Sequence, residues 1–401
     1  GLSRKEIESI GQQYTDSINV VFGWCMGITH HTHGTATVQT IVNLALLRGM
    51  VGKKHAGLLP IRGHSNVQGM GSMAVTPALK TAVFDRLTAE GVSVPTMTGH
   101  DTMACIRAAE RNEMDLAFCL GGNLYGSNPN STATIAAFSK IETVVYASTA
   151  LNTGHAWGTG KETIILPVLA RDEEKQSTTQ ESMFSFVRLS DGGINRHQNL
   201  RSEVGVISEM ASRVLGNDGL FNWGELEDHN SIRKIISRII PGYEFIENMG
   251  DTKEEFHIPG RILHAPTFPT ESGKAKFIYH PIPNLEPLKE GEFHLISVRS
   301  EGQFNTVVYE DEDLYRGQDR RDVILINKDD MVQMGLDKDD PVSVKSKTGE
   351  MNQILARPFD TKQGTVLMYY PEVNQLISRN VDPLSRTPGF KSTLVTILAS
   401  S

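Results

Sequence analysis

The sequence predicts an α/β fold, with one or more doubly wound, mostly parallel sheets carrying helices on both faces, followed by a mostly β, barrel-like carboxyl-terminal domain. Three observations support this prediction. The 401 residues suggest more than one domain, because a domain typically has roughly 150 residues. In the first part of the chain, apolar strand-like runs alternate with helical patterns, as in a parallel sheet covered by helices. From Glu292 onward, short strands separated by turns replace this alternation.

The first predicted unit is a buried strand and the amphipathic helix that follows it. Residues 16–22 are rich in apolar β-forming side chains, and residues 35–51 show the apolar period of a helix. The alternation then continues with a helix at 102–112, a strand at 115–120, a helix at 129–139, and strands at 142–146 and 163–169. Ligands of such sheets bind at the carboxyl ends of the strands, so we expect a site there.

The rest of the chain divides into a connecting region and the barrel-like domain. The connecting region has a charged loop at 171–182, helices at 202–215 and 225–239, and a proline-dotted stretch at 259–287 that we expect to cross between domains. The strands expected after it are 293–298, 323–326, 341–347, 351–358, 364–370 and 393–398. The predicted domains are therefore 1–170, 171–288 and 289–401.

Composition argues against several functional classes. The net charge is −8, from 39 basic and 47 acidic residues, and no run of basic residues predicts binding to nucleic acid. No apolar stretch is long enough to predict a membrane span. The three cysteines, Cys25, Cys105 and Cys119, are too few and too scattered for a disulfide framework or a four-thiolate cluster. They favour a reducing compartment, most simply the cytoplasm. Because the chain begins with Gly1, we expect it to be a piece of a longer protein.

The turn after the predicted strand 115–120 is the first candidate binding feature. Gly121 and Gly122 would let the backbone approach a phosphate-bearing ligand closely. The turn reads GGNLYGSN, so it lacks the G-x-G-x-x-G fingerprint that a nicotinamide-dependent dehydrogenase would require. An ordinary strand-to-helix turn is an equally good interpretation.

Three histidines, His30, His31 and His33, lie in the loop after the first predicted strand. Imidazoles so close together are candidate metal ligands. No helix-spaced His-x-x-x-His pair and no carboxylate accompanies them, so we favour polar residues that line a pocket, and we assign no metal ligand.

The segment LPIRGHSNVQGMG places Arg62 and His64 close together in a glycine-rich polar loop. A guanidinium is suited to orienting a small carboxylate, and an imidazole can exchange a proton. The alternative from composition alone is a connector whose arginine caps a helix or pairs with an acid. The barrel-like domain adds polar residues, among them Arg299, Asn374 and Lys391, that are individually unremarkable.

Taken together, these motifs resemble the molybdopterin-dependent oxidoreductases, in the formate dehydrogenase alpha-subunit-like branch of the dimethyl sulfoxide reductase family. The resemblance rests on residues 23–69, with AGLLPIRGHSNVQG at their end, and on TESGKAKF. It continues in VRSEGQFNT, in residues 326–351 and in PLSRTPGFKSTLVTI. These blocks occur in the family's order over nearly the whole chain.

The resemblance implies a bis-molybdopterin guanine dinucleotide with molybdenum or tungsten, a small anionic substrate such as formate, and a redox partner that it does not identify. It makes Arg62, with His64, the catalytic candidate, since the family's arginine in P-x-R-G positions the substrate anion. The cofactor-binding residues that it implies are Gly27, Thr29, Gly121, Gly122, Asn123, Ser148, Thr149, Asn152, Thr153, His155, Arg299, Ser300, Gln303, Asn374 and Lys391.

Three departures from the family pattern keep alternatives open. The family's 4Fe-4S cluster motif and its metal-ligating Cys or selenocysteine precede the region that this chain covers, so we expect the chain to be inactive alone. Many formate dehydrogenases read R-G-Q-N-N, whereas this chain has His64 and Ser65, which leaves the substrate open. The family often has an acidic residue that binds guanine after the second strand, and at this position the chain has Ala147, Ser148 and Thr149 instead. A non-catalytic nucleotide- or partner-binding module is the alternative function.

Overall fold

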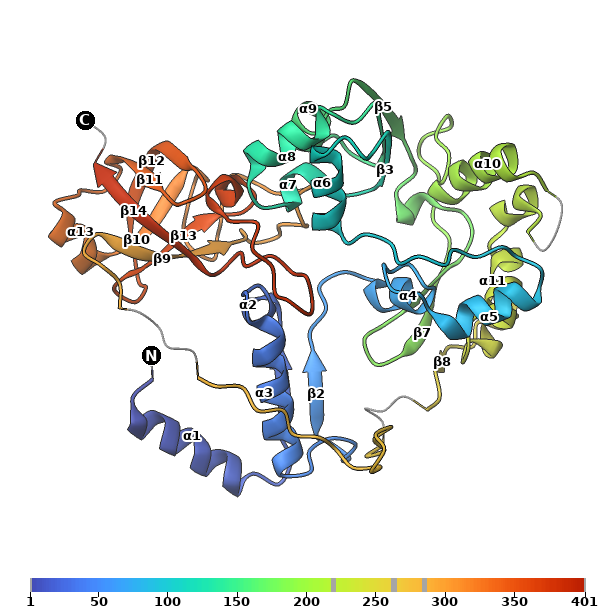
Figure 1. Cartoon of the computed structure of the whole chain (residues 1–401), viewed down its shortest axis with the longest axis horizontal. Coiled ribbons are helices and arrows are strands. Elements are labelled where there is room, and N and C mark those ends of the chain that lie inside the picture. Colours follow the sequence, from blue (N-terminus) through green and yellow to red (C-terminus); the bar gives the residue numbers. More distant parts are fainter. Residues whose placement is uncertain (1, 218–220, 261–264, 283–286, 400–401) are drawn as a thin grey trace.

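The computed structural model describes residues 2–217, 221–260, 265–282 and 287–399. Figure 1 shows parallel strands and helices, a smaller antiparallel sheet and a carboxyl-terminal barrel. The predicted α/β class with a barrel-like end is therefore confirmed. The predicted division at residues 170 and 288 stays a prediction. Among the described residues, no helix is both long and apolar enough to cross a membrane.

The amino-terminal part contains a two-stranded parallel sheet. Its elements are α1 (Arg4–Asp16), β1 (Val21–Trp24), α2 (Met26–Thr29), α3 (Gly34–Leu47) and β2 (Gly57–Pro60), and β1 pairs with β2. The predicted strand at 16–22 was wrong in its bounds, because α1 extends to Asp16. A capping box stabilises the start of α1, in which the Ser3 and Glu6 side chains each accept a hydrogen bond from the other's backbone N–H.

A three-stranded parallel sheet follows, in the order β3-β4-β5. The elements of this part are α4 (Val67–Ser72), α5 (Thr81–Ala89), α6 (Thr102–Glu110), β3 (Leu116–Leu120), α7 (Leu124–Ser127), α8 (Ser131–Phe138), β4 (Thr143–Ser148), α9 (Thr153–Trp157) and β5 (Glu162–Pro167). Met103 and Ile106 of α6 and Phe138 of α8 pack on Val144 of β4. The predicted strands and helices of this part are confirmed with small shifts, whereas α4, α5, α7 and α9 were not predicted.

The middle of the chain forms a three-stranded antiparallel sheet beside helices. Its elements are β6 (Thr178–Glu181), β7 (Phe186–Ser190), α10 (Glu203–Leu215), α11 (His229–Ile239), α12 (Met249–Thr252) and β8 (Phe256–His257). The prediction of a loop over 171–182 was wrong at β6, whose TTQE sequence has no apolar side chain to signal a strand. Helix α11 starts later than predicted because Asp228 caps it, accepting a hydrogen bond from the Ser231 N–H at 2.7 Å.

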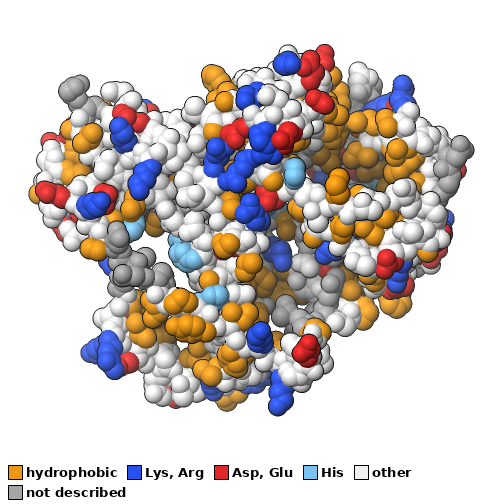
Figure 2. Space-filling model, in the orientation of Figure 1, with side chains coloured by type: hydrophobic (Ala, Val, Ile, Leu, Met, Phe, Trp, Pro, Cys, Tyr) orange, Lys and Arg blue, Asp and Glu red, His pale blue; other side chains and the backbone are white. Residues whose placement is uncertain are grey.

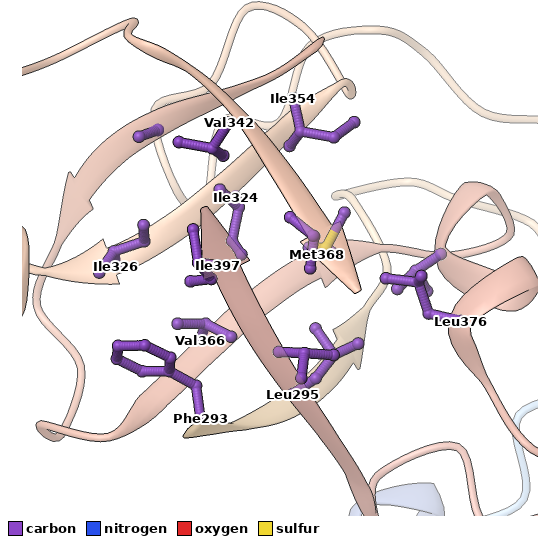
Figure 3. Packing of buried hydrophobic residues seen from close by; sticks show 14 of the residues in the cluster. Phe293, Leu295, Ile324, Ile326, Val342, Ile354, Val366, Met368, Leu376 and Ile397 are labelled. Carbon is purple, nitrogen blue, oxygen red and sulfur yellow. The ribbon is translucent and has the colours of Figure 1, made fainter. Parts of the chain in front are cut away.

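The carboxyl-terminal part is a closed six-stranded barrel with the order β10-β12-β11-β14-β9-β13. Its elements are β9 (Glu292–Val298), β10 (Val323–Asn327), α13 (Lys328–Met334), β11 (Pro341–Lys345), β12 (Glu350–Phe359), β13 (Thr365–Tyr369) and β14 (Thr393–Ala399). Figure 3 shows side chains from these strands meeting inside the barrel, including Leu295, Ile324 and Val366, none of which is measurably exposed. The helix α13 was not predicted.

Part of the stretch predicted to cross between domains packs along α3. The Asn43 side chain of α3 donates a hydrogen bond to the Ile278 carbonyl at 2.6 Å and accepts one from the Ile278 N–H at 3.2 Å. In Figure 1 this segment, in yellow-orange, runs beside α3 toward the barrel. Residues 261–264 and 283–286 of the predicted crossing segment lie outside the described residues.

Candidate functional site

The loop between β2 and α4 presents Arg62. The Ile61 N–H donates a hydrogen bond to the Trp24 carbonyl at 2.8 Å, which continues the pairing of the two strands one residue beyond their ends. Arg62 follows directly, its side chain is exposed, and it lines two neighbouring cavities of about 600 and 280 Å3. Within the described residues, no acidic side chain pairs with its guanidinium. This leaves the guanidinium fork available for a carboxylate ligand.

His64 connects the Arg62 cavity with the barrel. Its side chain lines the 280 Å3 cavity together with Arg62, and it also lines a third cavity together with His30 and Arg299. The imidazole packs edge-on against the ring of Phe304, with 6.0 Å between ring centroids. Arg62 and His64 therefore line the same cavity. His64 also lines the next cavity, which reaches the barrel.

A group of basic side chains lines a fourth cavity, of about 270 Å3, between α2 and the barrel. We call Arg299, Arg316 and Lys391 the cation cluster. Arg316 donates a hydrogen bond to the buried Asp313 carboxylate at 2.7 Å. Arg299 lies over the Tyr370 ring, 5.2 Å from its centroid, and has no acidic partner among the described residues. The cluster therefore carries more positive charge than its acids balance.

Lys391 is a partly buried member of the cation cluster. Its Nζ donates a hydrogen bond to the Ser297 carbonyl at 2.5 Å. Burial, followed by the positive charges of Arg299 and Arg316, lowers the pKa of Lys391 to about 8. An anion in this cavity would offset the repulsion among the three cations, so the cluster favours a negatively charged ligand.

His30 is close to the same cations. Burial, and then the charges of Lys391 and Arg299, lower the pKa of His30 to about 4, so its imidazole is neutral at pH 7. Its carbonyl accepts a hydrogen bond from the Lys391 N–H at 3.0 Å. The predicted cofactor-binding residue Gly27 lines the cavity on the α2 side, and Thr29 is the last residue of that helix.

Two residues of this cavity, Arg316 and Tyr370, were missed by reasoning from the sequence. Arg316 lies in the polar stretch between β9 and β10, where nothing in the local pattern separates it from Arg320 and Arg321. Tyr370 directly follows β13 and was read as the end of a strand. Packing of the barrel against α2 brings both side chains to the cavity. This packing cannot be predicted from the sequence immediately around either residue.

The glycine turn after β3 forms the second group of predicted residues. Gly121 and Gly122 both have positive φ, 67° and 68°, a conformation that side chains other than glycine disfavour. Asn152 donates a hydrogen bond from its side chain to the Gly122 carbonyl at 3.1 Å and caps α9 by accepting one from the Gly154 N–H at 2.9 Å. The turns after β3 and β4 are thus held together.

His155 joins this second group through both ring nitrogens. The Asn152 N–H donates to Nδ1 at 3.1 Å, which makes Nδ1 an acceptor and leaves the proton of the neutral ring on Nε2. Nε2 then donates to the Ser148 hydroxyl at 3.1 Å. Burial lowers the pKa of His155, in keeping with this neutral form. The neighbouring Thr149 is exposed at the end of β4.

The turn after β3 contacts the barrel through buried side-chain amides. Asn123 is 2% exposed, and its side-chain nitrogen donates to the Thr153 hydroxyl at 2.8 Å and to the Thr306 carbonyl at 3.2 Å. Asn374 is fully buried and donates to the Gly126 carbonyl at 2.8 Å, while its side-chain oxygen has no partner among the described residues. Both predicted residues therefore lie where the barrel meets the sheet.

Ser300 and Gln303 brace the loop that carries Arg299. The Gln303 side-chain oxygen accepts a hydrogen bond from the Ser300 N–H at 3.1 Å, and its nitrogen donates to the Tyr370 carbonyl at 2.9 Å. The Ser300 hydroxyl accepts a hydrogen bond from Arg321 at 2.8 Å. These two predicted residues therefore fix the loop and the start of the segment after β13.

The histidines near α2 do not form a cluster of ligands. His31 bridges the Ser392 hydroxyl at 2.9 Å and the Gly27 carbonyl at 3.1 Å, so both of its ring nitrogens are engaged. In the part of the chain that the structure describes, no three His, Cys, Asp or Glu side chains are grouped to hold a metal ion.

Figure 2 shows the molecule hollowed near its centre, between the barrel, the α3 region and the parts that carry β3–β5 and α11, with histidine side chains exposed beside the hollow. Neighbouring cavities in this part share residues. Arg62 belongs to the first two, His64 links the second to the third, and Arg299 links the third to the cation cluster. Arg62, His64, Arg299 and Lys391 thus lie along one row of cavities.

Comparison with known proteins identifies two family domains in the chain. Residues 8–213 match the model "Molybdopterin oxidoreductase", and residues 293–394 match the model "Molydopterin dinucleotide binding domain". The first match includes Arg62, His64 and the glycine turn. The second includes all three members of the cation cluster.

Two curated relatives align with nearly the whole chain. An uncharacterized oxidoreductase of Mycobacterium tuberculosis is 32% identical over 98% of this chain and 52% of its own length. Formate dehydrogenase H of Escherichia coli is 26% identical over 98% of this chain and 57% of its own length. The chain thus spans about half the length of the curated relatives that it matches.

A solved structure shares the fold. The acetylene hydratase of Pelobacter acetylenicus superposes with a TM-score of 0.69 at 14% sequence identity, covering 100% of this chain and 63% of that chain. At this identity the likeness concerns the fold alone. It agrees with the combination of parallel sheets and a closed barrel described above.

Proposed function

The chain belongs to the molybdopterin oxidoreductase family, and from this premise we propose that it is part of an enzyme that binds bis-molybdopterin guanine dinucleotide and oxidises formate to carbon dioxide. One observation carries the proposal: the guanidinium of Arg62, which pairs with no acid among the described residues, lies on a row of cavities that leads through His64 to the cation cluster. Arg62, which can bind an anion, thus lies at one end of this row of cavities. The cation cluster, which can bind the phosphates of a dinucleotide, lies at the other end.

The cation cluster fits the phosphate groups of such a cofactor. Lys391 is held among Arg299 and Arg316 without an acidic partner in the described residues, which is unfavourable unless an anion joins them. Arg299 and Lys391 would hold a phosphate, and Tyr370 would contribute an apolar wall. Gly27 leaves room on the α2 side, because a Cβ built there meets nothing within 4 Å.

The glycine turn would hold a second part of the dinucleotide. Gly122 has a positive φ, and a Cβ built there also meets nothing within 4 Å, so a ligand can approach the backbone closely. Thr149 lies exposed at the end of the next strand, close in the fold. When bound, the molybdopterin group supplies the metal that accepts the two electrons of the reaction.

Arg62 would bind and orient the substrate. Its planar fork matches the two oxygens of formate, and a charged hydrogen-bonded pair fixes both position and direction. Formate loses one proton and two electrons as carbon dioxide forms. His64, which shares the cavity with Arg62, is placed to take that proton.

The test uses the complete protein that carries this chain, matured in a host that makes the cofactor. Metal content, guanine nucleotide content and formate oxidation with a viologen acceptor are measured on one preparation. The proposal expects metal, nucleotide and turnover together. Nucleotide without turnover would support a non-catalytic binding module instead, and the absence of both metal and nucleotide would overturn the proposal.

A further inference from the structure

The buried carboxylate of Glu181 lies between two of the cavities described above. Glu181 is the last residue of β6, is 2% exposed and lines the 280 Å3 cavity that holds Arg62 and His64. Its carboxylate accepts hydrogen bonds from the Tyr243 hydroxyl at 2.6 Å and from the Ser72 hydroxyl. Both of these residues line the 600 Å3 cavity, a cleft between α4, α5 and the end of α11. Glu181 therefore borders one cavity and is hydrogen-bonded to the walls of the other.

Glu181 is the only carboxylate among the described residues that line the two cavities. The other titratable side chains that line them are Arg62, His64, Lys80 and Tyr243. The backbone of Glu181 is also held in place, because its N–H donates a hydrogen bond to the Asn66 side-chain oxygen at 3.1 Å. A group that can accept a proton is thus fixed beside the cavity in which formate would lose one.

The 280 Å3 cavity has room for water between His64 and Glu181. Its volume is several times the roughly 30 Å3 that one water molecule takes up in the liquid. The side-chain oxygen of Gln180, which also lines this cavity, is buried and has no hydrogen-bond partner among the described residues. A buried acceptor without a donor is unfavourable, and a water molecule in the cavity would supply the donor. Water would therefore connect the imidazole with the carboxylate.

The direct opening between the two cavities is unfavourable for a proton. Arg62, Val67 and Gln68 line both cavities, so the guanidinium lies where the cavities join. A protonated water molecule there would be repelled by a like charge, whereas the Glu181 carboxylate attracts it. The route through Glu181 also avoids the anion that Arg62 would bind.

The hydroxyl groups on the other side of Glu181 lead to solvent. A hydroxyl donates one hydrogen bond and accepts others, so Tyr243 and Ser72 can each give up a proton to one neighbour and take one from another. The cleft that they line is also lined by the exposed residues Lys80 and Thr81 at the start of α5. It therefore opens at the surface of the described chain.

We propose that Glu181 relays to solvent the proton that formate loses. The inference rests on the proposed function and deepens it, because it names the residue that returns His64 to its neutral form. His64 takes the proton as carbon dioxide forms, and the imidazolium then passes it through water to the Glu181 carboxylate. The resulting carboxylic acid passes the proton through the hydroxyls of Tyr243 and Ser72 to water in the cleft. The two electrons leave for the metal and the external acceptor, so each turnover releases one proton and leaves His64 and Glu181 unchanged.

The test compares the first turnover with steady-state turnover in the complete, cofactor-loaded protein, in weak buffer. In Glu181→Gln, rapid quenching with labelled formate should give a first turnover within about 2-fold of the wild-type rate, because His64 still takes that proton. Steady-state kcat with a viologen acceptor should fall about 10-fold or more, since the proton then leaves slowly. Release of the proton to a pH-indicator dye after the first turnover should slow to the same extent. Wild-type values of both kcat and proton release would overturn the inference.

Rescue by a small proton carrier distinguishes a relay from a structural role. Added imidazole should restore the kcat of Glu181→Gln to roughly half of the wild-type value or more, because it carries the proton to solvent. Glu247→Gln, at an exposed position that lines neither cavity, is the matched control and should behave as the wild type. A first turnover slowed as much as kcat, without rescue by imidazole, would mean that Glu181 only supports the shape of the site, and would contradict the relay.

A double variant tests the hydroxyl groups without changing the carboxylate. Ser72→Ala combined with Tyr243→Phe removes both hydroxyls and adds no new group. We expect it to lower kcat about as much as Glu181→Gln does, while the first turnover keeps its rate. A wild-type kcat in the double variant would rule out the route through these hydroxyls.

The same measurements separate this inference from the proposed function. If the wild-type protein oxidises formate and Glu181→Gln matches it in every measurement, the proposed function stands and the inference fails. If the wild-type protein holds metal and nucleotide but does not oxidise formate, the proposed function fails, and the inference that rests on it fails as well.

Discussion

The Asp382 carboxylate joins the barrel side of the molecule to helix α3 through Thr35. It accepts hydrogen bonds from the Thr35 backbone N–H at 3.0 Å and from the Thr35 hydroxyl at 2.7 Å. Asp382 is 1% exposed, and its own loop adds hydrogen bonds from Leu384 and Ser385. The first turn of α3 is therefore capped by a residue far away in the sequence. Since α3 follows α2, this contact also fixes the α2 side of the cation cluster.

Asp382→Asn should destabilise the protein, because the amide replaces a buried acceptor of several hydrogen bonds. We expect a loss of about 1–3 kcal/mol in the free energy of unfolding, measured with urea. Asp360→Asn, at an exposed position after β12, is the control and should be neutral. An unchanged urea midpoint for Asp382→Asn would show that the contact contributes nothing.

The same contact predicts a pH dependence. Burial pushes the pKa of Asp382 upward, but hydrogen bonds from Ser385, Thr35 and Leu384 outweigh it and lower the pKa to about 2, from 3.8. The unfolded chain therefore binds a proton at a higher pH than the folded protein does. The stabilisation is complete above about pH 4 and is lost as the pH falls toward 2. Urea unfolding between pH 5 and pH 2 should show a shallower pH dependence for Asp382→Asn, and equal slopes would contradict this.

Lys391 should control anion binding at the cation cluster. Because its pKa is lowered to about 8, binding of guanosine diphosphate should raise that pKa and take up protons from solution near pH 8. Calorimetry in two buffers of different ionisation enthalpy measures this uptake. Lys391→Met should weaken binding roughly 10-fold or more and abolish the uptake. Lys347→Met, in the exposed turn between β11 and β12, is the matched control, and an equal effect there would contradict the assignment.

His64 should influence formate turnover, because its side chain shares a cavity with Arg62 and lines the next cavity toward the barrel. His64→Gln introduces the residue that many formate dehydrogenases have after R-G, but an amide cannot take the proton that formate loses. We expect kcat/KM for formate to fall about 10-fold or more in the complete protein, while metal and nucleotide content stay unchanged. A rise in formate activity at unchanged cofactor content would instead show that this position sets substrate choice and that the imidazole is not the proton acceptor.

Much of the fold could be predicted because the strands carry strong local patterns. Residues of β10 are almost entirely apolar, and β9 alternates between buried Phe293 and Leu295 and exposed His294. The strand β6 could not be predicted, because its polar sequence forms a strand only through pairing with β7. The helix α1 does have a local signal, the Ser3 and Glu6 capping box, which the prediction overlooked.

The candidate site was predictable in part. Arg62, Arg299 and Lys391 follow from motifs in the sequence, yet nothing local shows that cavities connect them. Arg316 joins the cation cluster only through tertiary packing, and the cleft beside Arg62 depends on α5, a helix that the sequence pattern did not reveal. Side chains that meet across distant elements leave no periodic signal in either element.

The proposed function requires that Arg62 holds a substrate carboxylate beside a molybdopterin cofactor. The most direct measurement compares the complete wild-type protein with Arg62→Lys for turnover, metal and guanine nucleotide content. We predict that the variant keeps metal and nucleotide but loses about 100-fold or more in kcat/KM, because an ammonium cannot reproduce the guanidinium fork. Turnover unchanged at equal cofactor content would show that the Arg62 guanidinium does not position the substrate.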